Sequence, residues 1–172
     1  SSVAFWKQGT TRWDGRIFTE SRNYTVQHGI LTNAAVGSAL GQCKSSKSST
    51  VVLAAVTLQV GQTAAAAPKQ GDVLVTVVGT GTTADFTNIP MLQSFLQRLL
   101  DENLELEQLV ILEGKAAYRL VVTISLLDVA GSVIDVCVAA ASAALLDTRL
   151  PTKPLIEDGI VYTSESEGMK PF

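Results

Sequence analysis

The sequence predicts an α+β domain built from layers of helices and mostly antiparallel strands. The apolar segments follow one another as strands, helix, strands, helix, and the strands arrive in groups separated by short turns. This order favours antiparallel pairing over a doubly wound parallel sheet. Apolar residues make up 47% of the 172 residues and charged residues only 17%. The chain can therefore bury a sizeable core and still have apolar surface for contacts between subunits.

The first group of strands is expected before residue 80. Two short strands fall within 24–40, and a polar connector follows over 43–50. Runs of β-branched residues predict longer strands at 51–60 and 73–78. The segment between these two strands, 61–71, is expected to form an exposed loop.

Two helices are predicted in the second half of the chain. Leucines at helical spacing and Pro90 at the start predict a helix over 91–103. Two strands, 109–112 and 118–127, are expected to follow. An Ala-rich helix comes next, with apolar side chains at Ile134, Cys137, Val138, Ala141 and Leu145. We expect Ile134, Val138, Ala141 and Leu145 to face a buried sheet.

Composition excludes several classes of function. The net charge of −3 and pI near 5.1 argue against a free-standing nucleic-acid binder, which normally carries a basic excess. Two distant cysteines and a single histidine favour neither a disulfide framework, nor a zinc site, nor a Ser-His-Asp triad. We therefore expect no cofactor and no metal, and a reducing compartment. No signal peptide or membrane-length apolar run is present, so no membrane partner is expected.

Few residues are candidates for a binding site. Gly79-Thr80-Gly81-Thr82 has the backbone of a phosphate cradle, but it lacks the other residues of a nucleotide motif, which favours a flexible loop. Lys44 and Lys47 among serines, and Arg98 on the first helix, are candidates for contacts with an RNA backbone. The simpler interpretation of all three is a solvated surface. No paired carboxylates or nucleophile–base pair can be identified.

A succession of short motifs resembles the opening of an RNase PH domain. That family begins with an R-x-D-G-R turn, followed by a further arginine, a G-S-A strand end and a T-x-V-x-A-x-V strand. The turn is present here as Arg12, Asp14, Gly15 and Arg16. Arg22, 37–40 and 50–56 follow in the family's order, and the resemblance extends to about residue 155. Each motif is weak alone, and their order makes the resemblance more specific.

The resemblance implies a two-layer RNase PH-like fold, of the ribosomal protein S5 domain 2-like type, with helices packed on one face of the sheet. It divides the chain into an N-terminal arm at 1–11, the domain at 12–156 and a polar segment at 157–172. A short strand is expected at 160–162. The family continues with a second strand–helix unit, so the domain is expected to be incomplete at its C-terminal end.

The resemblance also implies a degenerate phosphate site. Active members bind inorganic phosphate through a Thr-Arg pair at the start of the second helix, where an anion meets a helix N-terminus and a cation. The corresponding residues here are Val133 and Ile134, whose side chains donate no hydrogen bond. The segment 85–90 also lacks the arginines that active members carry before the first helix. Both departures imply a non-catalytic ring subunit of an RNA exosome rather than an enzyme.

The expected function is structural: one of six RNase PH-like subunits in a ring that threads RNA for 3′–5′ processing and degradation, including that of rRNA. The expected partners are other ring subunits, exosome cap subunits and RNA. The expected location is the nucleus, the nucleolus and the cytoplasm. Two alternatives stay open, namely an active phosphate-dependent 3′–5′ exoribonuclease and an unrelated small α+β binding domain.

Overall fold

The computed structural model describes residues 16–17, 19–44, 49–63, 67, 69–83 and 88–151, and the backbone of three short strands beyond them. The elements in chain order are β1 (Asn23–His28), β2 (Gly37–Lys44), β3 (Ser49–Gly61), β4 (Asp72–Gly79), η1 (Gly81–Thr83), α2 (Ile89–Asn103), η2 (Leu106–Leu109), β5 (Val110–Leu112), β6 (Ala116–Asp128), α3 (Val133–Asp147), β7 (Arg149–Pro151), β8 (Leu155–Glu157), β9 (Ile160–Tyr162) and β10 (Met169–Pro171).

The main sheet has six strands in the order β1-β2-β3-β6-β4, and β5 also pairs with β6. Every pair in it is antiparallel except β4 with β6. The connection between these two parallel strands runs through α2, as a parallel pair requires a crossover. The prediction of a mostly antiparallel α+β fold is therefore confirmed, with one parallel pair that the sequence did not reveal.

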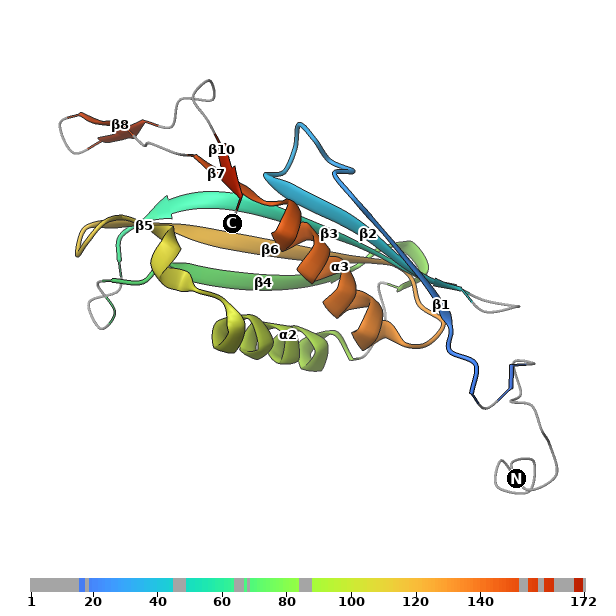
Figure 1. The fold of residues 1–172 in the computed structure, drawn as a ribbon. Helices are drawn as coiled ribbons and strands as arrows, with labels where there is room; N and C mark the ends of the chain where they lie inside the picture. The colour runs from blue at the N-terminus through green and yellow to red at the C-terminus, as the bar shows by residue number, and fades with distance from the viewer. Residues whose placement is uncertain are drawn as a thin grey trace.

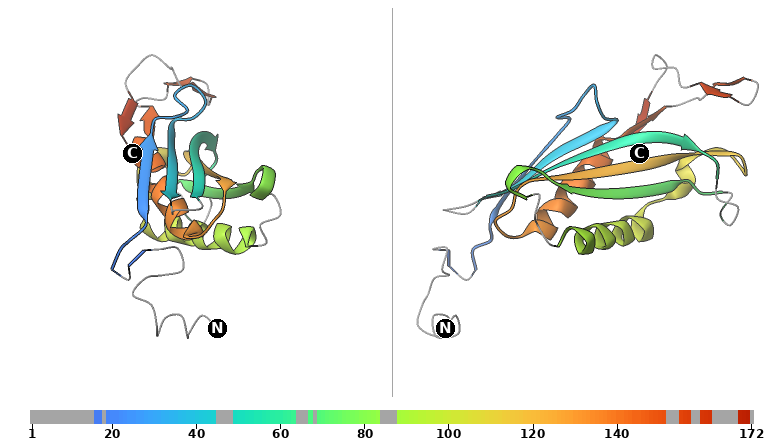
Figure 2. Two further views of the ribbon diagram at one scale, coloured as in Figure 1. Left: turned by 90° about the vertical axis from the view of Figure 1, so that its right-hand side faces the viewer. Right: turned by 180° about the vertical axis from the view of Figure 1, so that it is seen from behind.

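Both helices pack on the same face of the sheet, as Figures 1 and 2 show. Helix α3 lies across β1, β2 and β3, and α2 lies beside β4. Helix α2 buries Leu92, Leu96 and Leu100, which are spaced one turn apart and so form a single stripe toward the sheet. Neither helix of the described residues is long and apolar enough to cross a membrane.

Strand β6 is the centre of the core. Its alternate residues Leu120, Val122, Ile124 and Leu126 are fully buried, while the residues between them are more exposed. This alternation follows from the two-residue period of a strand, which points successive side chains to opposite faces. The core therefore lies between β6 with its neighbouring strands and the helical layer.

The polar connector predicted at 43–50 is shorter than expected. Strand β2 continues to Lys44 and β3 begins at Ser49. Strand alternation explains the difference, because it directs Cys43 into the core and leaves Lys44 exposed. The polar neighbours of Cys43 concealed this in the sequence. The two predicted strands within 24–40 are present as β1 and the first half of β2.

Helix α3 turns a different face to the sheet from the one predicted. Its buried residues are Val136, Cys137, Ala140, Ala141, Ala144 and Leu145. Ala141 and Leu145 are buried as predicted, but Ile134 is 43% exposed and Val138 is only half-buried. The prediction for Ile134 is wrong because α3 is apolar on nearly all sides, so hydrophobic spacing alone does not identify its inner face.

The C-terminal segment contains further strands. β8 pairs with β9, which is the strand predicted at 160–162, and β10 pairs with β7. The arm at 1–11 lies outside the described residues, so its prediction stays open.

Replacing Ala141 with phenylalanine is expected to lower the free energy of unfolding by about 1–3 kcal/mol. Ala141 is 2% exposed against the sheet, and a large ring there forces the helix away. Urea unfolding of Ala141→Phe measures the change. Ser142→Phe on the exposed side is the matched control, because it adds the same ring without entering the core. An Ala141→Phe variant as stable as the control would contradict this packing.

Candidate functional site

The turn between β6 and α3 leads into Val133 and Ile134, the residues that the sequence predicts as a degenerate phosphate site. Gly131 has φ +119° and Ser132 has φ +53°, so two successive residues adopt positive φ before the helix begins. Thr50 of β3 holds this turn in place. Its hydroxyl oxygen accepts a hydrogen bond from the Ala130 N–H at 2.9 Å and donates one to the Gly131 carbonyl at 2.6 Å. The start of α3 is thereby fixed to the sheet.

Arg22, just before β1, reaches this turn. Its Nη1 donates to the Ser132 Oγ at 3.0 Å, and a Cβ added to Gly131 would lie 2.7 Å from the same nitrogen. Glycine at position 131 therefore leaves room for the guanidinium as well as permitting the backbone angle. The contact places a positive charge beside the N-terminus of α3.

Arg22 and Ser132 line a cavity of about 430 Å³ together with Arg16, Thr19, Glu20, Ser21 and Tyr24. Arg16 is the described member of the R-x-D-G-R turn, and its Nη1 donates to the Glu20 carbonyl at 3.0 Å. Arg12, Asp14 and Gly15 lie outside the described residues. The structure therefore brings the end of this motif to the start of α3, which the sequence separates by more than a hundred residues.

The two residues at the predicted phosphate-binding positions, Val133 and Ile134, present no polar side chain. Val133 packs against the core. Ile134 borders a second cavity of about 380 Å³, whose lining includes Asn88 and Met91 at the start of α2. Asp135 places a carboxylate in the first turn of α3, and the Tyr24 hydroxyl donates to it at 3.5 Å. This carboxylate occupies the positive end of the helix and repels an anion there.

The candidate RNA contacts do not form one cluster. Lys44 is exposed at the end of β2, where it pairs in register with Asn23 and Ser49. The Ser49 hydroxyl bonds Asp128, so Lys44 lies at the same end of the sheet as the β6–α3 turn. Arg98 is on α2 with its side chain 81% exposed, and its Nε donates to Glu102 at 2.8 Å. Lys47 lies outside the described residues.

The Gly79–Thr82 segment, predicted as a flexible loop, contains the end of β4 and the start of η1 (Gly81–Thr83). Thr80 and Thr83 both donate hydroxyl hydrogen bonds to the Leu126 carbonyl, at 2.8 and 2.5 Å. The Thr83 hydroxyl also accepts from the Thr80 N–H at 2.8 Å. These hydrogen bonds join the end of β4 to the end of β6. Among the backbone amides that a phosphate cradle would use, that of Thr80 is already bonded within the fold.

The described residues offer little for catalysis elsewhere. They contain no group of three metal-ligating side chains. Burial raises the pKa of the Cys137 thiol to about 12, so this thiol stays protonated at neutral pH and is a poor nucleophile. The site residue that sequence reasoning missed is Tyr24, and the contacts of the motif residues Thr50 and Ser132 with this turn are visible only in the fold. Arg22 was noted as a motif residue, without its contact.

Comparisons with known proteins identify relatives of the whole described region. Residues 20–151 match the model of the 3′ exoribonuclease family, domain 1 (RNase_PH). The exosome complex component Rrp42 of Methanothermobacter thermautotrophicus is 29% identical over an alignment of 171 residues, and the match covers 94% of this chain and 60% of that protein. Rrp42 of Sulfurisphaera tokodaii is 30% identical over an alignment of 165 residues, and the match covers 91% of this chain and 58% of that protein. The chain thus spans about three-fifths of these relatives.

Solved structures show the same fold. An archaeal exosome core matches with a TM-score of 0.70 and 29% identity, over 87% of this chain and 57% of that chain. An Archaeoglobus fulgidus exosome with RNA bound to the active site matches with a TM-score of 0.73 and 28% identity, over 87% of this chain and 60% of that chain. Rice Rrp46, at 22% identity, 79% and 60% coverage and a TM-score of 0.56, shares the fold alone.

Proposed function

Because this chain belongs to the RNase PH family of 3′ exoribonucleases, we propose that it is a structural, non-catalytic subunit of the RNase PH-like ring of an RNA exosome. In this role it helps to hold and thread RNA for 3′–5′ processing and degradation, including that of rRNA. Family membership excludes the alternative of an unrelated α+β binding domain.

The lack of catalysis rests on the first turn of α3. Val133 and Ile134 stand where active members carry the Thr-Arg pair, and neither side chain binds an anion. The carboxylate of Asp135 adds a negative charge at the same helix end. A phosphate ion would therefore lose two favourable contacts and meet one repulsive charge.

The ring assignment is supported by the relatives and by the surface of the helices. The curated relatives are exosome complex components, and the matching structures at 28–29% identity are exosomes. On α2 and α3, Met91, Phe95 and Leu146 are 60%, 45% and 79% exposed. Apolar side chains in these positions suit contacts with further protein. Ring subunits, and exosome cap subunits beside them, are the partners that we propose.

For contacts with RNA we propose Lys44, Lys47 and Arg98. Lys44 is the strongest of the three, because it is exposed and lies at the end of the sheet that carries the β6–α3 turn. The charge of Arg98 is already compensated in part by Glu102. The nucleus, nucleolus and cytoplasm remain the proposed locations.

One observation favours a second function, an active phosphate-dependent exoribonuclease. Arg22 holds a positive charge beside Ser132 at the N-terminus of α3, and Arg16 lines the same cavity. Such an arrangement is able to attract an anion. Release of nucleoside diphosphates from RNA by the purified chain separates this function from the structural one.

Assembly tests the proposed function directly. We expect the isolated chain to self-associate, and we expect co-expression with a catalytic-type RNase PH-like subunit to yield a defined complex on gel filtration. Binding to the folded state alone stabilises by about 2.7 kcal/mol when the partner is at a hundred times Kd. This corresponds to a rise in Tm of roughly 5–10 °C for a chain of this size. The rise must depend on partner concentration.

An unrelated soluble protein at the same concentration is the control, and it should leave Tm unchanged. If the chain runs as a clean monomer and its Tm ignores every RNase PH-like partner, the ring-subunit function is wrong.

A further inference from the structure

Strand β4 is an edge strand of the main sheet in the described residues, and after Asp72 at its start its side chains carry no charge against pairing with another strand. It reads DVLVTVVG, with neither proline nor lysine. Its register with β6 is unbroken from Asp72 to Gly79, so no bulge twists it away. An exposed edge of this composition is a template for strand addition. Protection must therefore come from outside the strand.

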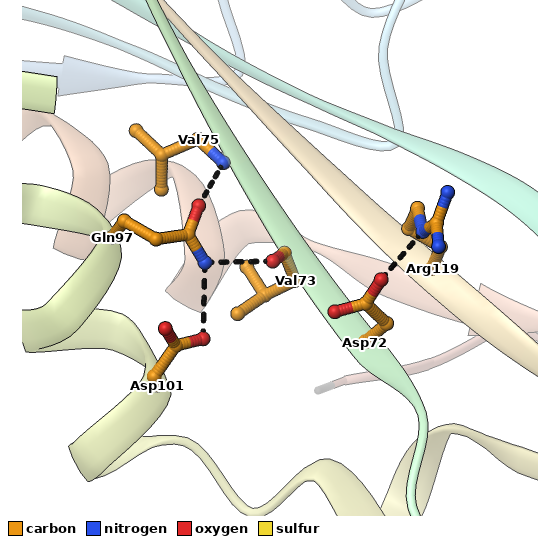
Figure 3. A network of polar contacts seen from close by, with 6 residues as sticks. All are labelled: Asp72, Val73, Val75, Gln97, Asp101 and Arg119. Carbon is orange, nitrogen blue, oxygen red and sulfur yellow. Dashed lines mark hydrogen bonds and ion pairs between the residues drawn. The ribbon is translucent and has the colours of Figure 1, made fainter. Parts of the chain in front are cut away.

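The side chain of Gln97 on α2 supplies this protection of the β4 edge. Its Oε1 accepts from the Val75 N–H at 2.8 Å and its Nε2 donates to the Val73 carbonyl at 2.8 Å, as Figure 3 shows. The carboxamide thus offers one acceptor and one donor to the edge, as a peptide group of an added strand would. Nε2 also donates to Asp101 at 3.0 Å, which fixes the orientation of the amide.

Gln93, one turn earlier on α2, extends this cover. Its Oε1 accepts from the Val77 N–H at 3.2 Å. Gln93 and Gln97 each directly follow a buried leucine of α2, so the packing of these leucines on the sheet positions both glutamines beside β4. At the start of β4, Asp72 and Arg119 face each other in register and form an ion pair at 2.7 Å, also visible in Figure 3. The position of β4 is thereby held at its beginning and along its outer edge.

We propose that Gln93 and Gln97 close the β4 edge to strands of other chains. Within the described residues, no side chain forms a hydrogen bond with the backbone of β1, which serves as the reference edge. The two glutamines therefore keep the β4 edge out of strand-mediated association. This role is independent of whether the chain is catalytic.

Hydrogen exchange of the unmodified chain is the first test. The amides of Val75 and Val77 are expected to exchange at least about tenfold more slowly than the β1 amides that do not pair with β2, because a side-chain acceptor protects them. If these two amides exchange as fast as the open edge of β1, the proposal is overturned without any variant.

The second test removes the side chains of the two glutamines. In Gln93→Ala/Gln97→Ala we expect faster exchange at Val75 and Val77, and self-association at a concentration at least about tenfold below that of the parent, seen by light scattering. Gln108→Ala is the matched control, because its amide bonds only the Glu105 side chain, at 2.6 Å. It should behave as the parent. A folded double variant with open amides and parental self-association would overturn the proposal. If the variant does not fold, the hydrogen exchange of Val75 and Val77 in the parent chain decides whether the proposal holds.

Discussion

Gly37→Ala is expected to lower the free energy of unfolding by about 3 kcal/mol or more, the upper part of the range for overpacking. A Cβ at this position would overlap the Ala144 carbonyl oxygen and the Thr148 hydroxyl, and would lie 2.8 Å from the Thr148 Cα. Two of these three atoms belong to the backbone at the end of α3, so they move only if the helix moves. Urea unfolding followed by circular dichroism measures the loss.

Gly61→Ala is the matched control for this prediction. Gly61 ends β3 without a positive φ, and a Cβ added there would have no atom within 4 Å, so the same methyl group should change stability by less than about 0.5 kcal/mol. Equal stability of the two variants would show that α3 does not pack closely on the start of β2.

The expected loss of stability reflects how closely α3 packs on β2. Gly37 and Gly41 of β2 face a row of small residues on the helix. A Cβ at Gly41 would approach the Ala140 methyl and the Val136 side chain at 3.1 Å. Ala140 and Ala144 are fully buried. Small residues on both sides allow the helix backbone to come close to the strand, and close packing of this kind leaves no space for an added methyl group.

Elements with a strong periodic pattern were predictable from the sequence. The helix expected over 91–103 is α2 (Ile89–Asn103), and the strand expected at 51–60 is β3 (Ser49–Gly61). The leucine spacing of α2 results from burial of one helix face, whereas β3 was predicted from its run of β-branched residues. The inner face of α3 was not predictable in this way, because an Ala-rich helix has no single apolar stripe.

The candidate site was predictable only in its local part. The positions of Val133 and Ile134 came from resemblance. The contact between Arg22 and Ser132 joins residues 110 apart, and Thr50 is 80 residues from Ala130. Such contacts depend on strand order, which side-chain periodicity does not encode. The contact of Asp135 with Tyr24 likewise joins distant parts of the chain, at the start of α3 and in β1.

Purified chain, incubated with single-stranded RNA and inorganic phosphate, is expected to release no nucleoside diphosphate above a buffer control. A catalytic family member in the same assay should be at least about a thousandfold faster, since removing even one preorganised contact to a reacting charge costs about 10²–10³ in rate. The physical reason is the start of α3, where Val133 and Ile134 offer no donor and Asp135 repels the anion. Chromatography of the nucleotide products provides the measurement.

A measurement of phosphate binding tests, without requiring turnover, whether the residues at the start of α3 prevent the anion from binding. Val133→Thr/Ile134→Arg/Asp135→Asn restores the family's pair at the helix start and removes the repulsive charge, so calorimetry with inorganic phosphate should detect binding that the parent lacks. Asp135→Asn alone is the control, and it should bind no more phosphate than the parent because it adds no cation. Nucleoside diphosphate release by the parent chain would reject the non-catalytic function and favour the arginines at the same helix end, Arg16 and Arg22, as its phosphate-binding residues.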